Sequence, residues 1–123
     1  MSYNTTGYRN EDGVLVTQGQ TAVSQATSIT TGVTCNAYSG VITTVSQTVA
    51  AGAEAEFTVT NNKVAATDVV VASIKTHTSA GSFTVHTTAT AAGSFKLTLT
   101  NLHASAAGNN TLTINFIVLK AAA

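Results

Sequence analysis

The chain has 123 residues, which is the size of one ordinary domain. Charged residues make up 8% of it, and five basic and five acidic residues leave a net charge of zero. Nucleic-acid binding needs a positive stripe of Lys and Arg, so this composition argues against a nucleic-acid partner. A neutral surface with few charges also gives little protection against self-association.

Threonine supplies most of the polarity that charged residues lack. The chain contains 24 Thr and 20 Ala, but only 29 Val, Ile, Leu and Phe residues in total. Thr favours strands, where it gives a polar face without charge. So few large apolar residues make a lean core, which burial in an oligomer would enlarge. The composition therefore favours an all-β domain that is stabilised by assembly.

The sequence shows no signal for export or membrane insertion. Cys35 is the only cysteine, so no disulfide can form within one chain. The residues after Met1 lack the apolar run of a signal peptide, and the longest apolar run, residues 116–119, is too short to span a bilayer. We expect a protein that is made in a cytoplasm and has no membrane partner.

Residues 1–12 are polar and show no periodicity. They form either a frayed terminus or an arm that lies on a neighbouring subunit, with Tyr3 and Tyr8 as anchors beside Arg9. Gly13 ends this segment, and residues 13–123 are predicted to form a single β-sandwich domain.

Strands are predicted where apolar and polar residues alternate or where β-branched residues cluster. The segment 54–60 shows alternation well, because Phe57 and Val59 face one side while Glu54 and Glu56 face the other. A loop is expected at residues 47–55, since Gly52 interrupts its alanines. The other predicted strands cover residues 14–18, 27–34, 39–46 and 68–76, the segments that open at Phe83 and Phe95, and residues 111–119.

Two of these segments carry further information about the sheets. Residues 68–76 include Val69-Val70-Val71 and are apolar on both faces, which predicts a strand near the middle of a sheet. The sequence Ala-Gly-Ser-Phe then occurs twice, at residues 80–83 and 92–95. This spacing is that of successive antiparallel strands, each opened by a turn. A polar loop is expected at residues 101–110.

The last strand changes character along its length. Leu112, Ile114 and Phe116 face one side, but Ile117 and Leu119 place bulk on the side that begins polar. A strand that becomes apolar on both faces is covered on both faces. We predict that Ile117 and Leu119 form an oligomer contact; the alternative is that a loop such as residues 47–55 covers them.

About eight strands, no convincing helix and no proline indicate an all-β fold. Eight strands in some 110 residues fit a two-sheet antiparallel sandwich. We expect a jelly-roll-like arrangement, with an immunoglobulin-like sandwich as the alternative.

No residue pattern predicts catalysis, a cofactor or a metal. The histidines, His77, His86 and His103, have no partner at metal-ligand spacing, and Glu54 and Glu56 are expected on a solvated sheet face. Cys35 is expected to be a small buried hydrophobe. Sugar binding usually needs an exposed aromatic, for which only Tyr38 qualifies. We therefore predict that the protein is not an enzyme.

Several strand segments together resemble small virion proteins of tailed bacteriophages. The segments that carry the resemblance are residues 28–34, 39–44, 57–61, 68–70, 93–95 and 114–116. In that family such a domain serves as a capsid decoration (cement) protein or as a module of a head or tail fibre. The resemblance covers about residues 17–120 and implies no catalytic or ligand-binding residue.

The resemblance implies a virion protein on the capsid surface, synthesised in the host cytoplasm. Its expected partners are the major capsid protein and further copies of itself, as a homotrimer. Tyr3, Tyr8, Arg9, Ile117 and Leu119 are then the candidate oligomer or capsid contacts. The alternative function is a receptor- or glycan-binding module of a fibre or adhesin, with Tyr38 and the loop at residues 101–110 as its contact surface.

Overall fold

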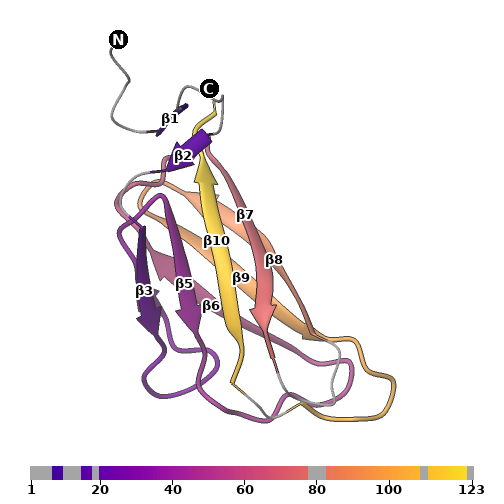
Figure 1. The fold of residues 1–123 in the computed structure, drawn as a ribbon. Helices are drawn as coiled ribbons and strands as arrows, with labels where there is room; N and C mark the ends of the chain where they lie inside the picture. The colour runs from indigo at the N-terminus through magenta and orange to yellow at the C-terminus, as the bar shows by residue number, and fades with distance from the viewer. Residues whose placement is uncertain (1–6, 10–14, 18–19, 78–82, 109–110, 122–123) are drawn as a thin grey trace.

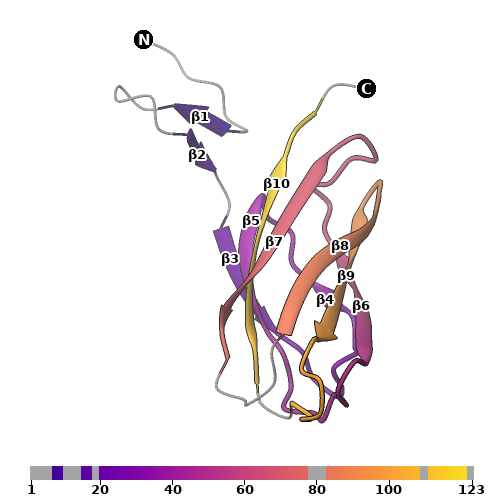
Figure 2. The ribbon, with the colours of Figure 1, turned by 90° about the vertical axis from the view of Figure 1, so that its right-hand side faces the viewer.

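The computed structural model describes residues 7–9, 15–17, 20–77, 83–108 and 111–121. These residues form strands and connecting turns but no helix. Eight strands make two four-stranded sheets that face each other as a sandwich (Figures 1 and 2). The predicted fold class, an all-β two-sheet sandwich, is confirmed.

The two sheets of the sandwich, sheet 1 and sheet 2, each contain four strands. Sheet 1 has the order β3 (Gln20–Ser24), β5 (Ser39–Thr43), β10 (Thr113–Leu119) and β7 (Val69–Thr76). Sheet 2 has the order β4 (Val33–Thr34), β6 (Glu54–Thr60), β9 (Ser94–Asn101) and β8 (Phe83–Ala91).

Both sheets are mixed, which refines the prediction of a purely antiparallel sandwich. β3 runs parallel to β5, and β4 runs parallel to β6, while the other pairs in the two sheets are antiparallel. The chain crosses from one sheet to the other after β3, β4, β5, β6, β7 and β9, and each crossing reverses its direction. Strands that are two apart in the chain therefore run the same way when they become neighbours. The remaining pairs are antiparallel, as in the jelly-roll and immunoglobulin-like sandwiches.

The strands with one polar face lie where the alternation predicts them. In β6, Ala55, Phe57 and Val59 are buried, while Glu54, Glu56 and Thr60 are exposed. β10 alternates in the same way from Ile114 to Val118.

The strand predicted at residues 27–34 is wrong. β3 ends at Ser24, and turns occupy most of the interval before β4 begins at Val33. Side chains hold these turns: the Gln25 amide donates to the carbonyls of Ile29 and Thr31, and the Thr31 hydroxyl accepts from the Ser28 N–H at 2.9 Å. Local hydroxyl and amide hydrogen bonds of this kind compete with strand pairing.

The prediction that residues 68–76 lie in mid-sheet is also wrong. β7 is the edge strand of sheet 1 and pairs only with β10 there. Its Val70 is buried, but Val69 and Val71 are exposed on the outer face. The apolar residues on that second face are therefore not covered by the chain itself.

The core lies between the two sheets, where one aromatic ring from each sheet packs against the other. Phe95 of sheet 2 and Phe116 of sheet 1 pack with ring centroids 5.2 Å apart and planes tilted by 58°. Leu97, Leu99 and Ile114 beside them are fully buried.

Two buried asparagines fasten the ends of the sandwich. Asn61 follows β6 and donates to the Ala37 carbonyl at 2.7 Å, and Asn101 ends β9 and donates to the Val49 carbonyl at 3.0 Å. The side-chain oxygen of each accepts the N–H two residues further on, which makes a tight turn. Each amide thus ties a strand end of sheet 2 to a connection that crosses between the two sheets.

The N-terminal strands form a separate two-stranded antiparallel sheet. β1 (Gly7–Arg9) pairs with β2 (Leu15–Thr17), which matches the strand predicted at residues 14–18. This hairpin lies beyond the end of the sandwich at which β10 ends (Figures 1 and 2). The division into residues 1–12 and 13–123 stays a prediction.

Candidate functional site

An apolar patch lies on the outer face of sheet 1, at the β7 edge. Val69 pairs with Leu119, and Val71 pairs with Ile117, so the four side chains lie together on one face. Val69 is 51% exposed, Val71 is 49% exposed and Leu119 is 37% exposed. Among the described residues these are three of the four exposed large hydrophobic side chains. We call Val69, Val71, Ile117 and Leu119 the apolar patch.

Ile117 and Leu119, the two contact residues that the sequence predicts within the sandwich, both lie in this patch. Ile117 is half-buried and Leu119 is exposed, on the face that the sequence pattern assigns to them. The loop at residues 47–55 does not cover them: Val49 pairs with Gly108 and the Gly52 N–H bonds the Asn101 carbonyl, both at the opposite end of the sandwich. The alternative that this loop buries the patch is therefore wrong.

Val69 and Val71 are contact candidates that sequence reasoning missed. Their strand was assigned to the middle of a sheet, where both faces are covered. The signal that finds them is the one used for the last strand, namely apolar residues on both faces. Because β7 and β10 are neighbours in sheet 1, the outward apolar side chains of the two strands form one surface.

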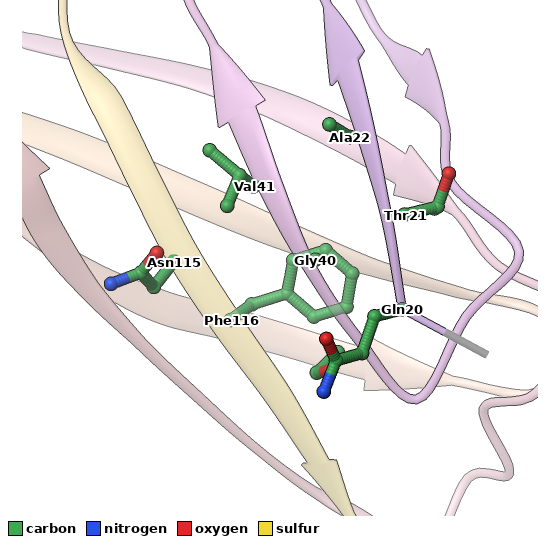
Figure 3. Close-up of a pocket in the computed structure, with 8 residues that line it drawn as sticks. Gln20, Thr21, Ala22, Gly40, Val41, Asn115 and Phe116 are labelled. Carbon is green, nitrogen blue, oxygen red and sulfur yellow. The ribbon is translucent and has the colours of Figure 1, made fainter. Parts of the chain in front are cut away.

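A hollow with a volume of about 520 Å³ lies on the same outer face, on the side of β3 and β5 (Figure 3). β3, β5 and β10 all contribute to it, and its polar groups include the amides of Gln20 and Asn115. Its lining residues are Gln20, Thr21, Ala22, Ser39, Gly40, Val41, Asn115 and Phe116. We call this surface the hollow.

Gly40, one of the residues that line the hollow, has no room for a side chain. A Cβ at Gly40 would point inward and meet the Phe116 ring at 2.8 Å, the Thr21 carbonyl at 2.8 Å and the Cys35 sulfur at 3.0 Å. The sheet therefore approaches its own core closely at this point.

The two outer faces of the sandwich differ sharply in charge. On sheet 1, Lys75 is the only charged residue among the described outward positions. On sheet 2, Glu56 forms an ion pair with Lys96 at 3.2 Å and accepts hydrogen bonds from the hydroxyls of Thr88 and Thr98. Thr88 is the extra residue of a bulge in β8, which brings its hydroxyl to Glu56. Sheet 2 thus has a charged and solvated outer face, while the outer face of sheet 1 is uncharged apart from Lys75.

The carboxylates in the described part of the chain show no arrangement for acid–base chemistry. Glu54 and Glu56 are both exposed on the outer face of sheet 2, as predicted. The hydrogen bond from Thr88, and then the contact with Lys96, lower the pKa of Glu56. A general acid at neutral pH needs the opposite shift.

The three histidines lie in different parts of the domain: after β7, in β8 and in the loop after β9. The His77 ring meets Phe83 edge-on, with centroids 6.1 Å apart, and His86 is exposed on β8 opposite Thr98. The Nδ1 atom of His103 accepts the N–H groups of Ser105 and Ala106. Among the described residues, no three His, Cys, Asp or Glu side chains are grouped so that they could hold a metal ion.

Cys35 and Tyr38 contribute to packing. Cys35 is buried, as predicted, and burial raises the pKa of its thiol. Tyr38 is half-buried against the core, and the Lys63 ammonium lies 5.9 Å from its ring centroid. It is therefore not the freely exposed aromatic that sugar binding requires.

The N-terminal contact candidates are placed only in part. Tyr3 lies outside the described residues. Tyr8 and Arg9 belong to β1, where they pair with Val16 and Leu15.

Comparisons of the chain with protein-family models, curated proteins and solved structures found no match. Within the described residues, no helix is long and apolar enough to cross a membrane. Function is therefore inferred from the resemblance in the strand residues and from the contrast between the two faces.

Proposed function

We propose that this protein is a non-enzymatic structural component of a tailed-bacteriophage virion. In this proposal it is a decoration (cement) protein, made in the host cytoplasm, that binds the outside of the head shell as a homotrimer. Its partners are the major capsid protein and other copies of itself. The resemblance of its strand segments to small phage virion proteins suggests this role.

The observation that carries the proposal is the outer face of sheet 1, which has Lys75 as its single charge among the described outward positions. A solvated domain of this size normally spreads charges over its whole surface, because they keep it soluble. Here the other described charges lie on sheet 2, in β1 or at the ends of the sandwich, while the apolar patch is left open. Exposed apolar surface rimmed by polar residues marks an interaction site. This arrangement supports a protein that is packed against neighbours on one side.

We assign the proposed contacts to two regions. Ile117 and Leu119 belong to the contact between copies, since they lie in the apolar patch. Tyr3, Tyr8 and Arg9 belong to the contact with the shell. The hairpin that contains Tyr8 and Arg9 lies beyond the sandwich, which leaves it free to reach another protein (Figure 2).

The alternative, a glycan- or receptor-binding module, has less support. Tyr38 packs against the core, and the loop after Asn101 is held by that residue's amide and by His103. Leu102 is its exposed apolar residue. One exposed apolar side chain in this loop thus supports glycan or receptor binding, whereas the outer face of sheet 1 supports the virion role.

Shell binding by a truncated protein tests the proposal. The full-length chain is mixed with empty shells assembled from the major capsid protein of its phage and is measured by co-sedimentation. Deletion of residues 2–12 is expected to abolish sedimentation with the shells while the mass from light scattering shows an unchanged oligomer. A Thr60→Ala variant, on the exposed polar face of sheet 2, is the matched control and should bind normally.

The two possible failures have different meanings. If the truncated protein binds as well as the full-length chain, the shell contact does not involve residues 2–12. If the full-length chain does not bind at all, the decoration function is wrong.

A further inference from the structure

The outer face of sheet 1 carries two unlike surfaces on its two sides. The apolar patch lies at the β7 edge, and the hollow lies towards β3, the opposite edge strand of the same sheet. We propose that the apolar patch of one copy packs into the hollow of a second copy. The inference rests on the proposed function only in taking three copies as the closed assembly.

The lack of charge favours a second copy over a charged partner as the occupant. Burying this face against a partner removes from water whatever charges the two surfaces carry, and an unpaired buried charge is costly. The patch carries no charge, and neither do the hollow's lining residues. These two surfaces can therefore meet without burying a charge of their own, whereas a charged partner would lose hydration and find no counter-charge in either surface.

The chemistry of the two surfaces is also complementary. Val69 and Val71 project from the edge strand, and about half of each side chain is exposed. The hollow presents Ala22 and Val41 as apolar surface, with the Gln20 and Asn115 amides beside them (Figure 3). Apolar side chains can fill this space while the amides stay at the rim, which is how protein interfaces are commonly arranged.

The placement of the two surfaces favours a ring. A contact between two different surfaces is heterologous, and repeating it closes a ring when the rotation fits. Because patch and hollow lie on opposite sides of one face, each copy can give its patch to one neighbour and its hollow to the other. β10 and β5, the central strands, would then face the symmetry axis. A contact of patch with patch would instead be two-fold and produce a dimer.

The size of the face sets the strength of the contact. The strands of sheet 1 have 5, 5, 7 and 8 residues, so at about 3.3 Å per residue and about 4.8 Å between strands the face covers roughly 400 Å², of which one contact uses about half. A standard stable interface buries about 800 Å² on each partner. The association is therefore expected to be reversible, with ring closure adding a second contact for each copy.

A charge exchange tests the proposal on the isolated protein, without shells. Val71→Lys alters the patch, and Ala22→Glu alters the hollow. Both side chains are exposed in the single chain, so both variants are expected to fold, which circular dichroism verifies. Each single variant should raise the dissociation constant of the oligomer at least tenfold, measured by sedimentation equilibrium.

The double variant Val71→Lys with Ala22→Glu decides between the geometries. If patch meets hollow, Lys faces Glu at every contact and the trimer mass returns. The control pairs Val71→Lys with Thr60→Glu on sheet 2, where no rescue is expected. A double variant that remains as dissociated as Val71→Lys overturns the proposal, and so does a wild-type protein that is monomeric at tens of micromolar. Shell binding is measured separately, so failure here leaves the decoration function standing.

Discussion

At the scale of single residues, Gly40 has the strictest requirement. An added methyl group at this position would lie 2.8 Å from both the Phe116 ring and the Thr21 carbonyl, and the latter belongs to the backbone of the neighbouring strand. Alanine in place of glycine reduces the entropy of the unfolded chain, which stabilises by about 0.4–1 kcal/mol at most. Overpacking a close-packed core costs about 1–3 kcal/mol, so the clash outweighs this gain.

We therefore predict that Gly40→Ala lowers the free energy of unfolding by about 1–2 kcal/mol, measured by urea denaturation. Ser24→Ala is the control, because Ser24 is exposed on the next strand and should change stability by less than about 0.5 kcal/mol. An unchanged urea midpoint for Gly40→Ala would show that β3 and β5 can separate freely at this point.

At the scale of elements, the end of β10 is fixed by one ion pair. The Lys120 ammonium binds the Asp68 carboxylate and donates to the Lys63 carbonyl at 3.0 Å. The Asp68 carboxylate also accepts the Ala65 N–H at 2.8 Å, and so caps the turn before β7, as its position before a strand indicates. These contacts join the ends of β7 and β10, the two strands that carry the apolar patch.

The Asp68 carboxylate makes stability depend on pH. Burial raises its pKa, but the Ala65 N–H and Lys120 together outweigh burial, and the pKa is lowered. A lowered carboxyl pKa in the folded state contributes stability that is present above the unfolded value of about 4 and is lost as the pH falls through the folded value. We predict a urea midpoint that is steady from pH 7 to about pH 5 and decreases below it.

Asp68→Asn should remove much of that decrease and cost about 1–3 kcal/mol at pH 7. The control Glu56→Gln removes a carboxylate whose pKa is also lowered, but this group is exposed, so solvent screens it and the change should be small. If the urea midpoint of Asp68→Asn decreases below pH 5 as steeply as that of the wild type, the Asp68 carboxylate is not the cause of the decrease.

The same element scale shows what the sequence could predict. Alternation located β6, which has one polar and one buried face, and β10, whose first half shows the same pattern, because this pattern depends only on the residues themselves. It could not locate β3 and β4, since the Gln25 amide and the Ser28–Thr31 hydroxyls decide where pairing stops. Nor could it place β7 at an edge, because a strand with two apolar faces has the same sequence whether a sheet or a second chain covers it. The parallel pairs follow from the crossings between sheets and leave no local signal.

At the scale of the whole molecule, the sandwich is polar on one side and uncharged on the other. The core depends on few large side chains for its length, since 29 Val, Ile, Leu and Phe residues serve 123 positions and some of them lie on the outer face. In the proposed assembly, the contact between copies buries apolar area that the single chain leaves exposed. Assembly and folding are then expected to be linked by mass action.

Thermal unfolding at different protein concentrations measures this link. When a trimer unfolds to three separate chains, a tenfold increase in concentration raises the free energy of unfolding per chain by two-thirds of RT ln 10. Since RT ln 10 is about 1.4 kcal/mol, the increase is about 0.9 kcal/mol per chain. At about 4 °C per kcal/mol for a domain of this length, we predict that Tm rises by about 4 °C for each tenfold increase in concentration. Ile117→Asp together with Leu119→Asp places two charges in the apolar patch, and its Tm should be lower and independent of concentration. Thr60→Asp on the polar face is the matched control and should keep the wild-type slope. A wild-type Tm that does not change with concentration would mean that the sandwich is stable alone, and the uncharged face would then have to serve the shell directly.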